Sequence, residues 1–266
     1  MLIKQKEKGG VYLSVSDEVL QLLRESEETI SGEEMAERLG ISRNSVWKAV
    51  QKLRQAEYEI VATTNRGYHL VSESNVLSPE NVRRYLSNST GCVAINVRDK
   101  VSSTNTVLKE LAEQGGREGM TIIAEHQEQG KGRLGRSFYS PRGSGLYMSV
   151  LLRPELYAEQ SLAITTAAAV SVARAIDRMT GEEARIKWVN DVYLRGKKVC
   201  GILTEASLDF ESGKLNYAVL GIGVNIQEPQ SGFPGDLGNV AGGIFQGTPS
   251  KGARPRLAAE ILNEFF

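Results

Sequence analysis

Near the start of the chain, three short segments place their hydrophobic residues on one side at helical spacing. The first covers residues 17–25 and predicts an amphipathic helix. A capping box from Ser31 to Glu34 predicts the start of a second helix, which is expected to end at Gly40. Ser42 then caps a third helix. Two helices joined by a short glycine-containing turn are typical of a helix-turn-helix.

The third helix separates apolar from basic residues. Its predicted core stripe consists of Val46, Ala49, Val50 and Leu53. Residues 41–56 contain four basic residues and no acidic one. Two short strands, 60–63 and 68–71, are then expected around the turn Asn65-Arg66-Gly67, and this hairpin is typical of a wing.

This arrangement predicts a DNA-binding surface on the third helix and the wing. Its candidate residues are Arg43, Asn44, Trp47, Lys48, Gln51 and Arg66. We expect Asn44 and Gln51 to reach base edges. We expect Arg43, Lys48 and Arg66 to contact phosphates. Trp47 could equally well contact DNA or cover the edge of the hydrophobic core. The alternative is a helix-turn-helix used only for protein contacts or packing.

A polar stretch at residues 72–75 separates this segment from alternating helices and strands that follow over about 190 residues. Ser78-Pro79 is typical of a helix start. We therefore predict two domains, at 1–72 and 73–266. The most hydrophobic stretch, 162–179, contains Thr165, Arg174 and Asp177, and it predicts a buried helix and not a membrane span.

The composition is ordinary for a soluble globular protein, with 41% apolar and 24% charged residues in 266. Because the net charge is zero, a DNA surface must arise from local segregation of charge. The first ten residues have no apolar run behind them and do not resemble a signal peptide. Cys92 and Cys200 match no metal or redox spacing. We expect reduced thiols and a cytoplasmic protein.

A glycine-rich basic segment, residues 130–137, contains Lys131, Arg133 and Arg136. Glycines allow close approach of the backbone to a ligand, and the three cations favour phosphate. Residues 138–143 cannot continue as the helix that a P-loop must open. The Gly-Ile-Gly at 221–223 likewise lacks a following helix. Both common nucleotide-binding folds are therefore disfavoured.

Two further segments contain candidate polar groups. A strand end at 185–191 followed by a hairpin at 192–205 is expected to bring Lys187, Asp191 and Lys198 together. The alternative is solvated hairpin charge. The small polar run from Ser102 to Asn105 predicts a cap for a helix at 106–113.

Together these motifs resemble biotin protein ligases in order and spacing. The matching segments are Ser103-Thr104-Asn105, Glu125-His126-Gln127 with the glycine segment, Lys187 to Asp191, Lys198 before Cys-Gly-Ile-Leu, and Gly-x-Gly-x-Asn225. The N-terminal segment is similar to that of the bifunctional bacterial members, which repress biotin synthesis genes. The resemblance implies an α+β protein with a winged helix-turn-helix and a mixed α/β catalytic domain of the class II aminoacyl-tRNA synthetase type.

Three features depart from the family pattern. Lys131 stands where many members have Arg, which keeps the charge but loses the bidentate fork. Val189 replaces a frequent Pro. Bacterial members usually continue into a small β-barrel domain, which we expect to be absent here.

The resemblance implies a two-step reaction and a regulatory role. Biotin and MgATP form biotinyl-5′-AMP and pyrophosphate, and a lysine of the biotin carboxyl carrier protein then accepts the biotinyl group. Neither step requires a protein nucleophile, so cations and positioning must supply catalysis. Biotinyl-AMP is expected to act as corepressor by promoting a homodimer that binds operator DNA.

The resemblance and the motifs also assign site residues. The catalytic candidates are Arg133, Arg136, Lys187, Lys198 and Asp191. The biotin-binding candidates are Ser103, Thr104, Asn105, Gln127, Lys131, Gly132, Arg133 and Lys198. The adenylate candidates are Arg136, Phe138, Asn190 and Asn225. Asp191 is expected either to hold Mg²⁺ or to orient a lysine. Phe138 fits adenine stacking and core packing alike.

Two rival functions remain open at this point. A lipoate-protein ligase shares this fold and adenylation chemistry. The second rival is a regulator whose ligand domain binds biotin but no longer catalyses.

Overall fold

The computed structural model describes residues 14–266 except 27, 64–65, 88–89, 91–92 and 210. The chain divides into two compact units, one ending at Val76 and the other beginning at Leu77. The boundary expected from sequence, between residues 72 and 73, lies four residues earlier. The expectations for the first ten residues, Asn65 and Cys92 fall outside the described residues.

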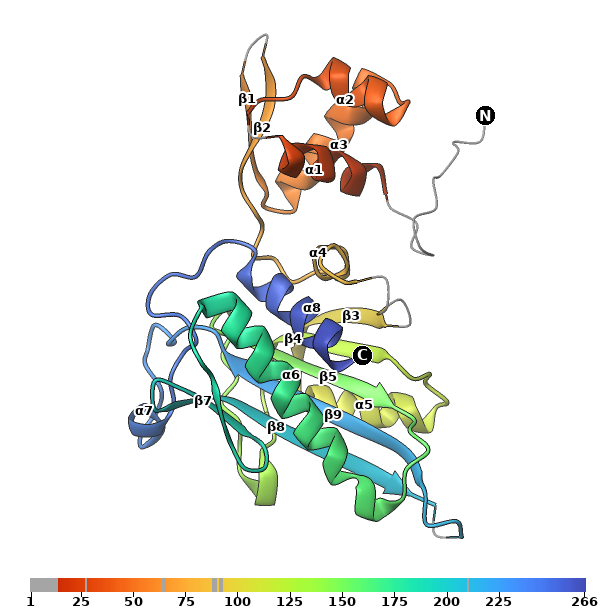
Figure 1. The fold of residues 1–266 in the computed structure, drawn as a ribbon, viewed down its shortest axis with the longest axis vertical. Coiled ribbons are helices and arrows are strands. Elements are labelled where there is room, and N and C mark those ends of the chain that lie inside the picture. Colours follow the sequence, from red (N-terminus) through yellow and green to blue (C-terminus); the bar gives the residue numbers. More distant parts are fainter. Residues whose placement is uncertain (1–13, 27, 64–65, 88–89, 91–92, 210) are drawn as a thin grey trace. The chain divides into compact units, whose positions relative to one another are not determined.

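Three helices and a hairpin form the N-terminal unit (Figure 1). They are α1 (Val15–Glu25), α2 (Gly32–Leu39), α3 (Arg43–Gln55), β1 (Glu59–Thr63) and β2 (Gly67–Ser72). The Ser31 side chain accepts a hydrogen bond from the Glu34 amide. The reciprocal half of the predicted capping box does not form, because the Glu34 carboxylate accepts a hydrogen bond from Arg38 instead. The complete box lies at Ser14 and Asp17 of α1.

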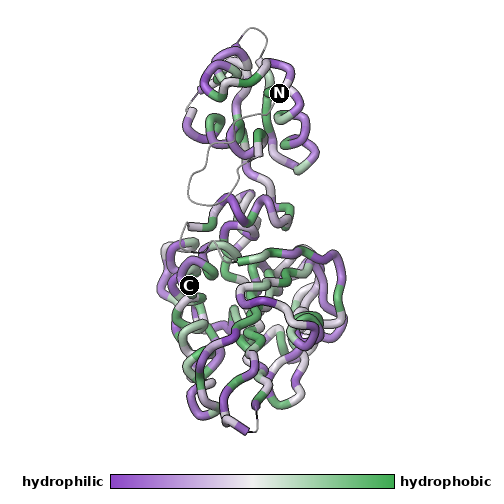
Figure 2. The backbone as a smooth tube through the Cα atoms, turned by 90° about the vertical axis from the view of Figure 1, so that its right-hand side faces the viewer, coloured by the Kyte–Doolittle hydropathy of each residue, from purple (hydrophilic) through white to green (hydrophobic). Residues whose placement is uncertain are grey.

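The N-terminal unit has its own apolar core, built from α1, α2, α3 and the hairpin. The predicted stripe on α3, Val46, Ala49, Val50 and Leu53, is buried in it. Arg54 donates two hydrogen bonds to the Ile60 carbonyl and so fastens α3 to the first wing strand. In Figure 2 hydrophobic and hydrophilic residues alternate along both units, as expected when each unit buries one side of its elements.

The C-terminal unit is organised around one seven-stranded sheet. The strands are β3 (Ala94–Val101), β4 (Met120–Gln127), β5 (Gly145–Leu152), β6 (Arg185–Lys187), β7 (Asp191–Leu194), β8 (Lys197–Leu208) and β9 (Leu215–Asn225). Their order in the sheet is β3-β4-β5-β9-β8-β7-β6. The pair β3–β4 is parallel and every other neighbouring pair is antiparallel.

Helices cover both faces of this sheet (Figure 1). They are α4 (Pro79–Arg83), α5 (Thr104–Glu113), α6 (Leu162–Thr180), α7 (Leu237–Val240) and α8 (Ala253–Phe265), with 3-10 turns η2 (Arg133–Gly135) and η3 (Ala158–Gln160). The main core packs α6 and α8 against the sheet, whereas α5 packs on the opposite face in a smaller cluster. The expected buried helix at 162–179 is α6. None of the described helices is long and apolar enough to cross a membrane.

A buried ion pair joins α8 to the sheet beside the segment that leads to Gln127. Arg254 donates to both oxygens of the Glu125 carboxylate, at 3.2 and 2.7 Å, and also to the Gly145 carbonyl. The two side chains are only 9% and 17% exposed. Glu125, part of a motif in the sequence, therefore has a structural partner.

We expect Arg254→Met to lower the free energy of unfolding of the C-terminal unit by about 3–5 kcal/mol, because it leaves the Glu125 carboxylate buried without a partner. Arg256→Met is the matched control, since Arg256 is 52% exposed and lies 3.7 Å from Glu260. It should change the free energy by about 1 kcal/mol or less. Urea unfolding of both variants measures the difference. Equal destabilisation would contradict this role for the buried pair.

Candidate active site

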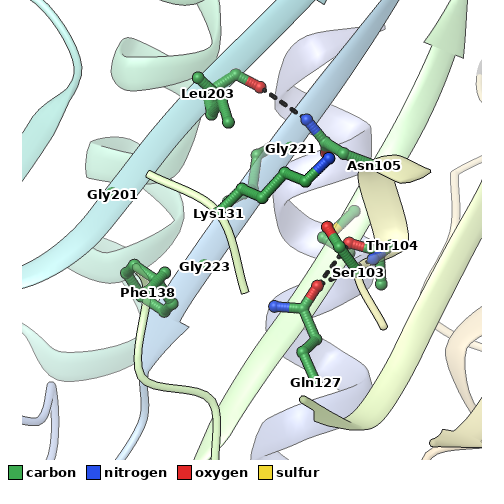
Figure 3. A pocket seen from close by; sticks show the side chains of 12 residues that line it. Ser103, Thr104, Asn105, Gln127, Lys131, Phe138, Gly201, Leu203, Gly221 and Gly223 are labelled. Atoms are coloured by element: carbon green, nitrogen blue, oxygen red, sulfur yellow. Dashed lines mark hydrogen bonds between the residues drawn. The ribbon is translucent and has the colours of Figure 1, made fainter. Parts of the chain in front are cut away.

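A pocket lies on the face of the sheet that carries α5 (Figure 3). Its lining comes from the start of α5, from β4, from the glycine-rich segment 130–137 and from β5, β8 and β9. The lining residues are Ser103, Thr104, Asn105, Gln127, Lys131, Phe138, Met148, Gly201, Leu203, Gly221, Ile222 and Gly223. Five of the eight candidate biotin residues, those from Ser103 to Lys131, therefore share one pocket.

Glycines leave the strands beneath this pocket without side chains. A Cβ atom at Gly221 would overlap the Asn105 side chain. A Cβ atom at Gly223 would lie 2.5 Å from the Phe138 ring, and one at Gly201 would lie 3.2 Å from it. Separations below 3.0 Å are sterically forbidden. Asn105 and Phe138 can therefore rest on the strands only because these positions lack side chains.

The α5 helix begins earlier than its sequence pattern indicates. It starts at Thr104, with Ser103 as N-cap, so the predicted start at residue 106 is wrong. The Ser103 side chain makes no capping hydrogen bond, although only 2% of the residue is exposed. Thr104 and Asn105 are the first residues of the helix and not its cap. The helix start thus presents these side chains to the pocket.

Thr104 and Gln127 form the first part of a hydrogen-bonded chain at the pocket wall. The Thr104 amide and hydroxyl both donate to Gln127 Oε1, at 2.9 and 3.1 Å. Gln127 Nε2 donates to the Ser140 hydroxyl at 2.9 Å. Ser140 in turn donates to the Phe138 carbonyl at 2.9 Å. Since a backbone N–H is a donor only, Thr104 fixes which end of the Gln127 amide faces it.

Asn105 is held from two sides. The Ser149 hydroxyl lies 2.6 Å from Asn105 Oδ1 and 2.6 Å from Thr104 Oγ1. Asn105 Nδ2 donates to Glu205 Oε2 at 2.8 Å, and Lys109 Nζ donates to the other Glu205 oxygen at 3.1 Å. Burial acts to raise the pKa of Glu205, but hydrogen bonds from Asn105 and Lys109 outweigh it and hold this pKa below its usual value.

The glycine-rich segment forms a short turn over the sheet. Lys131 pairs with Ser137 through a backbone bridge, and the Gly132 amide donates to the Arg136 carbonyl at 2.7 Å. Arg133 donates to Asn190 Oδ1 at 3.3 Å, while Asn190 Nδ2 donates to the Ile202 carbonyl. Gly132, Arg133 and Arg136 line a hollow beside the pocket, together with Lys131 and Glu205. Asn190 therefore links this segment to β8.

The hairpin of β7 and β8 brings two of its three candidate groups into contact. Lys198 Nζ donates to Asp191 Oδ1 at 2.6 Å, with both side chains partly exposed. Lys198 lies at the edge of the pocket, since its Cε is 3.5 Å from the place of a Cβ at Gly201. Lys187 is opposite Asp191 in the strand register. Its ammonium group, however, lies over the Tyr193 ring, 5.5 Å from the centroid.

The remaining nucleotide candidates occupy two places. Phe138 is half-buried, lines the pocket, and meets Tyr147 edge-on at 6.3 Å between centroids. Asn225 is buried at the end of β9, paired in register with Gly145. Burial raises the pKa of Tyr147 to about 12, and its hydroxyl donates to the Pro141 carbonyl. Tyr147 is therefore a neutral structural group.

Three polar residues of the site were not identified from sequence. They are Ser140, Ser149 and Glu205. A lone serine in the otherwise apolar strand Gly145–Leu152 was an available signal, because a buried hydroxyl requires a partner. Glu205 gave no such signal, since its partners Asn105 and Lys109 lie about a hundred residues away.

The candidate DNA-binding residues lie mainly on the exposed side of α3. Arg43, Asn44 and Lys48 are exposed, Gln51 is half-buried, and 51% of Trp47 is exposed. Arg43 has an exposed ion pair with Glu33 at 3.8 Å. Arg66 is exposed in the turn just before β2. The exposure of Trp47 argues against its covering the core edge.

Comparisons with known proteins place this architecture in a class. The model of the biotin/lipoate A/B protein ligase family matches residues 97–225, and an HTH domain model matches residues 16–69. The class is therefore a biotin/lipoate-type ligase domain joined to a helix-turn-helix.

Individual relatives narrow this class. The chain is 34% identical over 235 residues to the bifunctional ligase/repressor BirA of Bacillus subtilis. The match covers 88% of this chain and 72% of that protein. It is 32% identical to the protein of the same description from Escherichia coli, over 74% of this chain and 59% of that one. The chain belongs to the family of bifunctional biotin ligase/repressors.

A solved structure agrees with this assignment. The biotin protein ligase from Aquifex aeolicus in complex with biotin and ATP superimposes with a TM-score of 0.53 and 29% identity. The match covers 64% of this chain and 68% of that chain. The fold class and family predicted from the sequence are thus confirmed.

We expect Gly221→Ala to destabilise the protein by about 1–3 kcal/mol, because its methyl group must displace the Asn105 side chain. Gly238→Ala is the control, since a Cβ there meets its nearest atom at an ordinary 3.5 Å. Thermal unfolding of the two variants gives the comparison. A Gly221→Ala protein as stable as Gly238→Ala would show that the floor of the pocket tolerates a side chain.

Proposed function

We propose that the protein is a biotin protein ligase that activates biotin with ATP, transfers it to a lysine of a biotin carboxyl carrier protein, and represses transcription through its helix-turn-helix. The observation that supports this best is the single pocket shared by Ser103, Thr104, Asn105, Gln127 and Lys131. Binding of biotin and ATP by the Aquifex aeolicus structure supports the same substrates. A cytoplasmic location accords with both activities.

The polar groups of the pocket suit the ureido ring of biotin. Gln127 uses Oε1 toward Thr104 and one N–H toward Ser140, which leaves its second N–H for a ligand carbonyl. The Ser103 hydroxyl, buried without a capping bond, supplies a further donor or acceptor. Lys131 is exposed at the pocket rim. A site with such groups favours a ligand that pairs with them over one that does not.

Adenylate formation joins the biotin carboxylate to the α-phosphorus of ATP and releases pyrophosphate. The protein needs no nucleophile of its own, because the carboxylate oxygen attacks directly. Its task is to align the two anions and stabilise the negative charge on the phosphoryl oxygens. We assign this to Arg133, Arg136 and Lys198. Asn190 orients Arg133, and Asp191 orients Lys198. The Lys187 ammonium group lies over the Tyr193 ring, so this side chain would have to move before it could stabilise charge on the phosphate.

Phe138, Asn190 and Asn225 complete the proposed nucleotide site. The Phe138 ring already lies against the glycine strands, so adenine stacking would use its remaining exposed surface. Asn225 lies two residues beyond Gly223 at the strand end. This places it beyond the Phe138 side of the pocket, where we propose that it contacts the adenine side of the nucleotide.

Magnesium would be held by few protein ligands. No group of three or more His, Cys, Asp or Glu side chains able to hold a metal occurs among the residues that the structure describes. Asp191 fits a site that shares Mg²⁺ with phosphate oxygens and water, as one carboxylate commonly does. The ion would neutralise phosphate charge. The contact with Lys198 supports the other proposed role of Asp191, orienting a lysine.

Transfer of the biotinyl group breaks the mixed anhydride and forms an amide with the carrier lysine, releasing AMP. Only a neutral amine attacks, so the second step should be favoured as pH rises toward the pKa of a lysine. The same cations stabilise the phosphate of the leaving AMP.

Measurement of pyrophosphate exchange with biotin and with lipoate tests the proposed activity. We expect exchange with biotin only, followed by biotinylation of a carrier domain. Arg133→Ala should lower the exchange rate by about 10²-fold or more, because it removes a cation from the developing charge. Arg142→Ala is the control, since Arg142 pairs with Asp99 outside the pocket.

Three outcomes would contradict the proposal in different ways. Exchange with lipoate alone would indicate a lipoate ligase. Biotin binding without exchange would indicate a regulator that no longer catalyses. Full activity of the Arg133→Ala enzyme would contradict the role of that arginine only.

Repression should depend on a homodimer promoted by biotinyl-AMP. One helix-turn-helix buries too little surface for tight operator recognition, and such modules usually bind paired half-sites. If the adenylate orders the segment 130–137, association costs less entropy, and operator DNA must reciprocally favour the adenylate-bound form. Sedimentation with and without biotinyl-AMP, alongside operator binding, measures this coupling. A protein that stays monomeric at saturating adenylate, or binds operator equally without it, would contradict the proposal.

A further inference from the structure

Glu205 is an acidic side chain on β8 that lines the hollow beside the pocket. Only a quarter of this side chain is exposed, and both carboxylate oxygens have a donor, Asn105 Nδ2 on one and Lys109 Nζ on the other. Lys131, at the pocket rim, adds a favourable charge interaction. The carboxylate contacts Asn105 and Lys109 and none of the groups expected to react, so we look for its role in positioning these two side chains.

We propose that Glu205 is a positioning residue that sets the affinity for biotin, an inference that rests on the proposed function. It acts through Asn105. An ionised carboxylate only accepts hydrogen bonds, so Asn105 must turn its NH₂ group toward Glu205. The amide oxygen then faces Ser149, as observed at 2.6 Å. The carboxylate, helped by the Leu203 carbonyl that accepts from the same Nδ2 at 3.4 Å, therefore selects one of the two orientations of this amide.

Ser149 and Thr104 connect the fixed Asn105 amide to the other polar side chains that line the pocket. The single hydroxyl hydrogen of Ser149 is shared between Asn105 Oδ1 and Thr104 Oγ1, which both lie 2.6 Å from Ser149 Oγ. The Thr104 hydroxyl hydrogen points to Gln127 Oε1, which also accepts from the Thr104 amide. Gln127 is then left with its NH₂ group for Ser140 and for a ligand. The Thr104 amide fixes the orientation of Gln127, whereas Glu205 and the Leu203 carbonyl fix that of Asn105. Ser149 and Thr104 join these two side-chain amides into one hydrogen-bonded network.

Replacement of Glu205 by glutamine, its neutral isostere, weakens the preference of the Asn105 amide for one orientation. A glutamine at position 205 offers a donor and an acceptor, so it can pair with either end of the Asn105 amide. Only the long bond to the Leu203 carbonyl, at 3.4 Å, then still favours the native orientation. Its amide also cannot match the charge of Lys109. The groups offered to biotin would then be correctly aligned for only part of the time, and the apparent affinity would fall accordingly. Glu205 also lines the hollow that contains Arg133 and Arg136, but its carboxylate bonds to Asn105 and Lys109 and not to these arginines, so we expect ATP binding to depend on it less.

The test uses Glu205→Gln in the full chain, with biotin binding measured by calorimetry and KM values for biotin and ATP from pyrophosphate exchange. We expect about a tenfold weaker biotin affinity, which corresponds to about 1.4 kcal/mol. The KM for ATP should change less than about twofold. Glu113→Gln is the matched control, because Glu113 lies on the same helix as Asn105 and accepts a hydrogen bond from the Tyr217 hydroxyl at 3.4 Å.

A double-mutant cycle shows whether Glu205 acts through Asn105. If it does, Glu205→Gln should weaken biotin binding no further in an Asn105→Ala background. Ser149→Ala provides a second route if Glu205→Gln fails to fold, since it interrupts the same chain and should also raise the biotin KM selectively.

Several results would overturn the inference. They are unchanged biotin affinity in a folded Glu205→Gln protein, an equal loss for biotin and ATP, additivity with Asn105→Ala, or an unaffected Ser149→Ala enzyme. Wild-type protein that binds no biotin would overturn both this inference and the proposed function. Active wild type with an unaffected Glu205→Gln variant would overturn only the inference.

Discussion

The pocket depends on bare backbone in two adjacent strands. Where β8 and β9 pass beneath α5, positions 201, 221 and 223 are glycines, so the start of the helix and the Phe138 ring can lie against the sheet. The other face of the same strands bears Ile202, Ile222 and neighbouring apolar residues that pack under α6 and α8. Apolar side chains pack on one face of the sheet and stabilise it. The other face lacks side chains at the glycines, which leaves space for a ligand.

Polar side chains on that bare face must satisfy one another. Thr104, Asn105 and Ser149 are nearly fully buried, and an unpaired hydrogen-bonding group at this depth would be costly. The chain that they form with Gln127 and Glu205 meets this requirement. It also leaves a small number of groups for a substrate. Stability and recognition therefore depend on the same hydrogen bonds, and changes at the wall should affect both.

The sequence predicted most of the local structure, because local structure follows from short-range rules. Helical spacing identified α1, α2 and α3, a long hydrophobic stretch identified α6, and turn chemistry identified the wing. The errors lie at element ends. The Ser102–Asn105 run was read as a cap because small polar residues favour that position, but tertiary partners at Gln127 and Ser149 draw Thr104 and Asn105 into the helix.

The sequence by itself determined the family, the two-part organisation and the set of candidate cations, since these follow from motifs in a fixed order. Tertiary structure alone decided which of them meet. Lys198 pairs with Asp191 across a hairpin, but Lys187 turns to Tyr193. Glu125 pairs with Arg254, 129 positions away, and Asn105 with Glu205, 100 positions away. Such partners depend on strand register and helix packing, which no local spacing encodes.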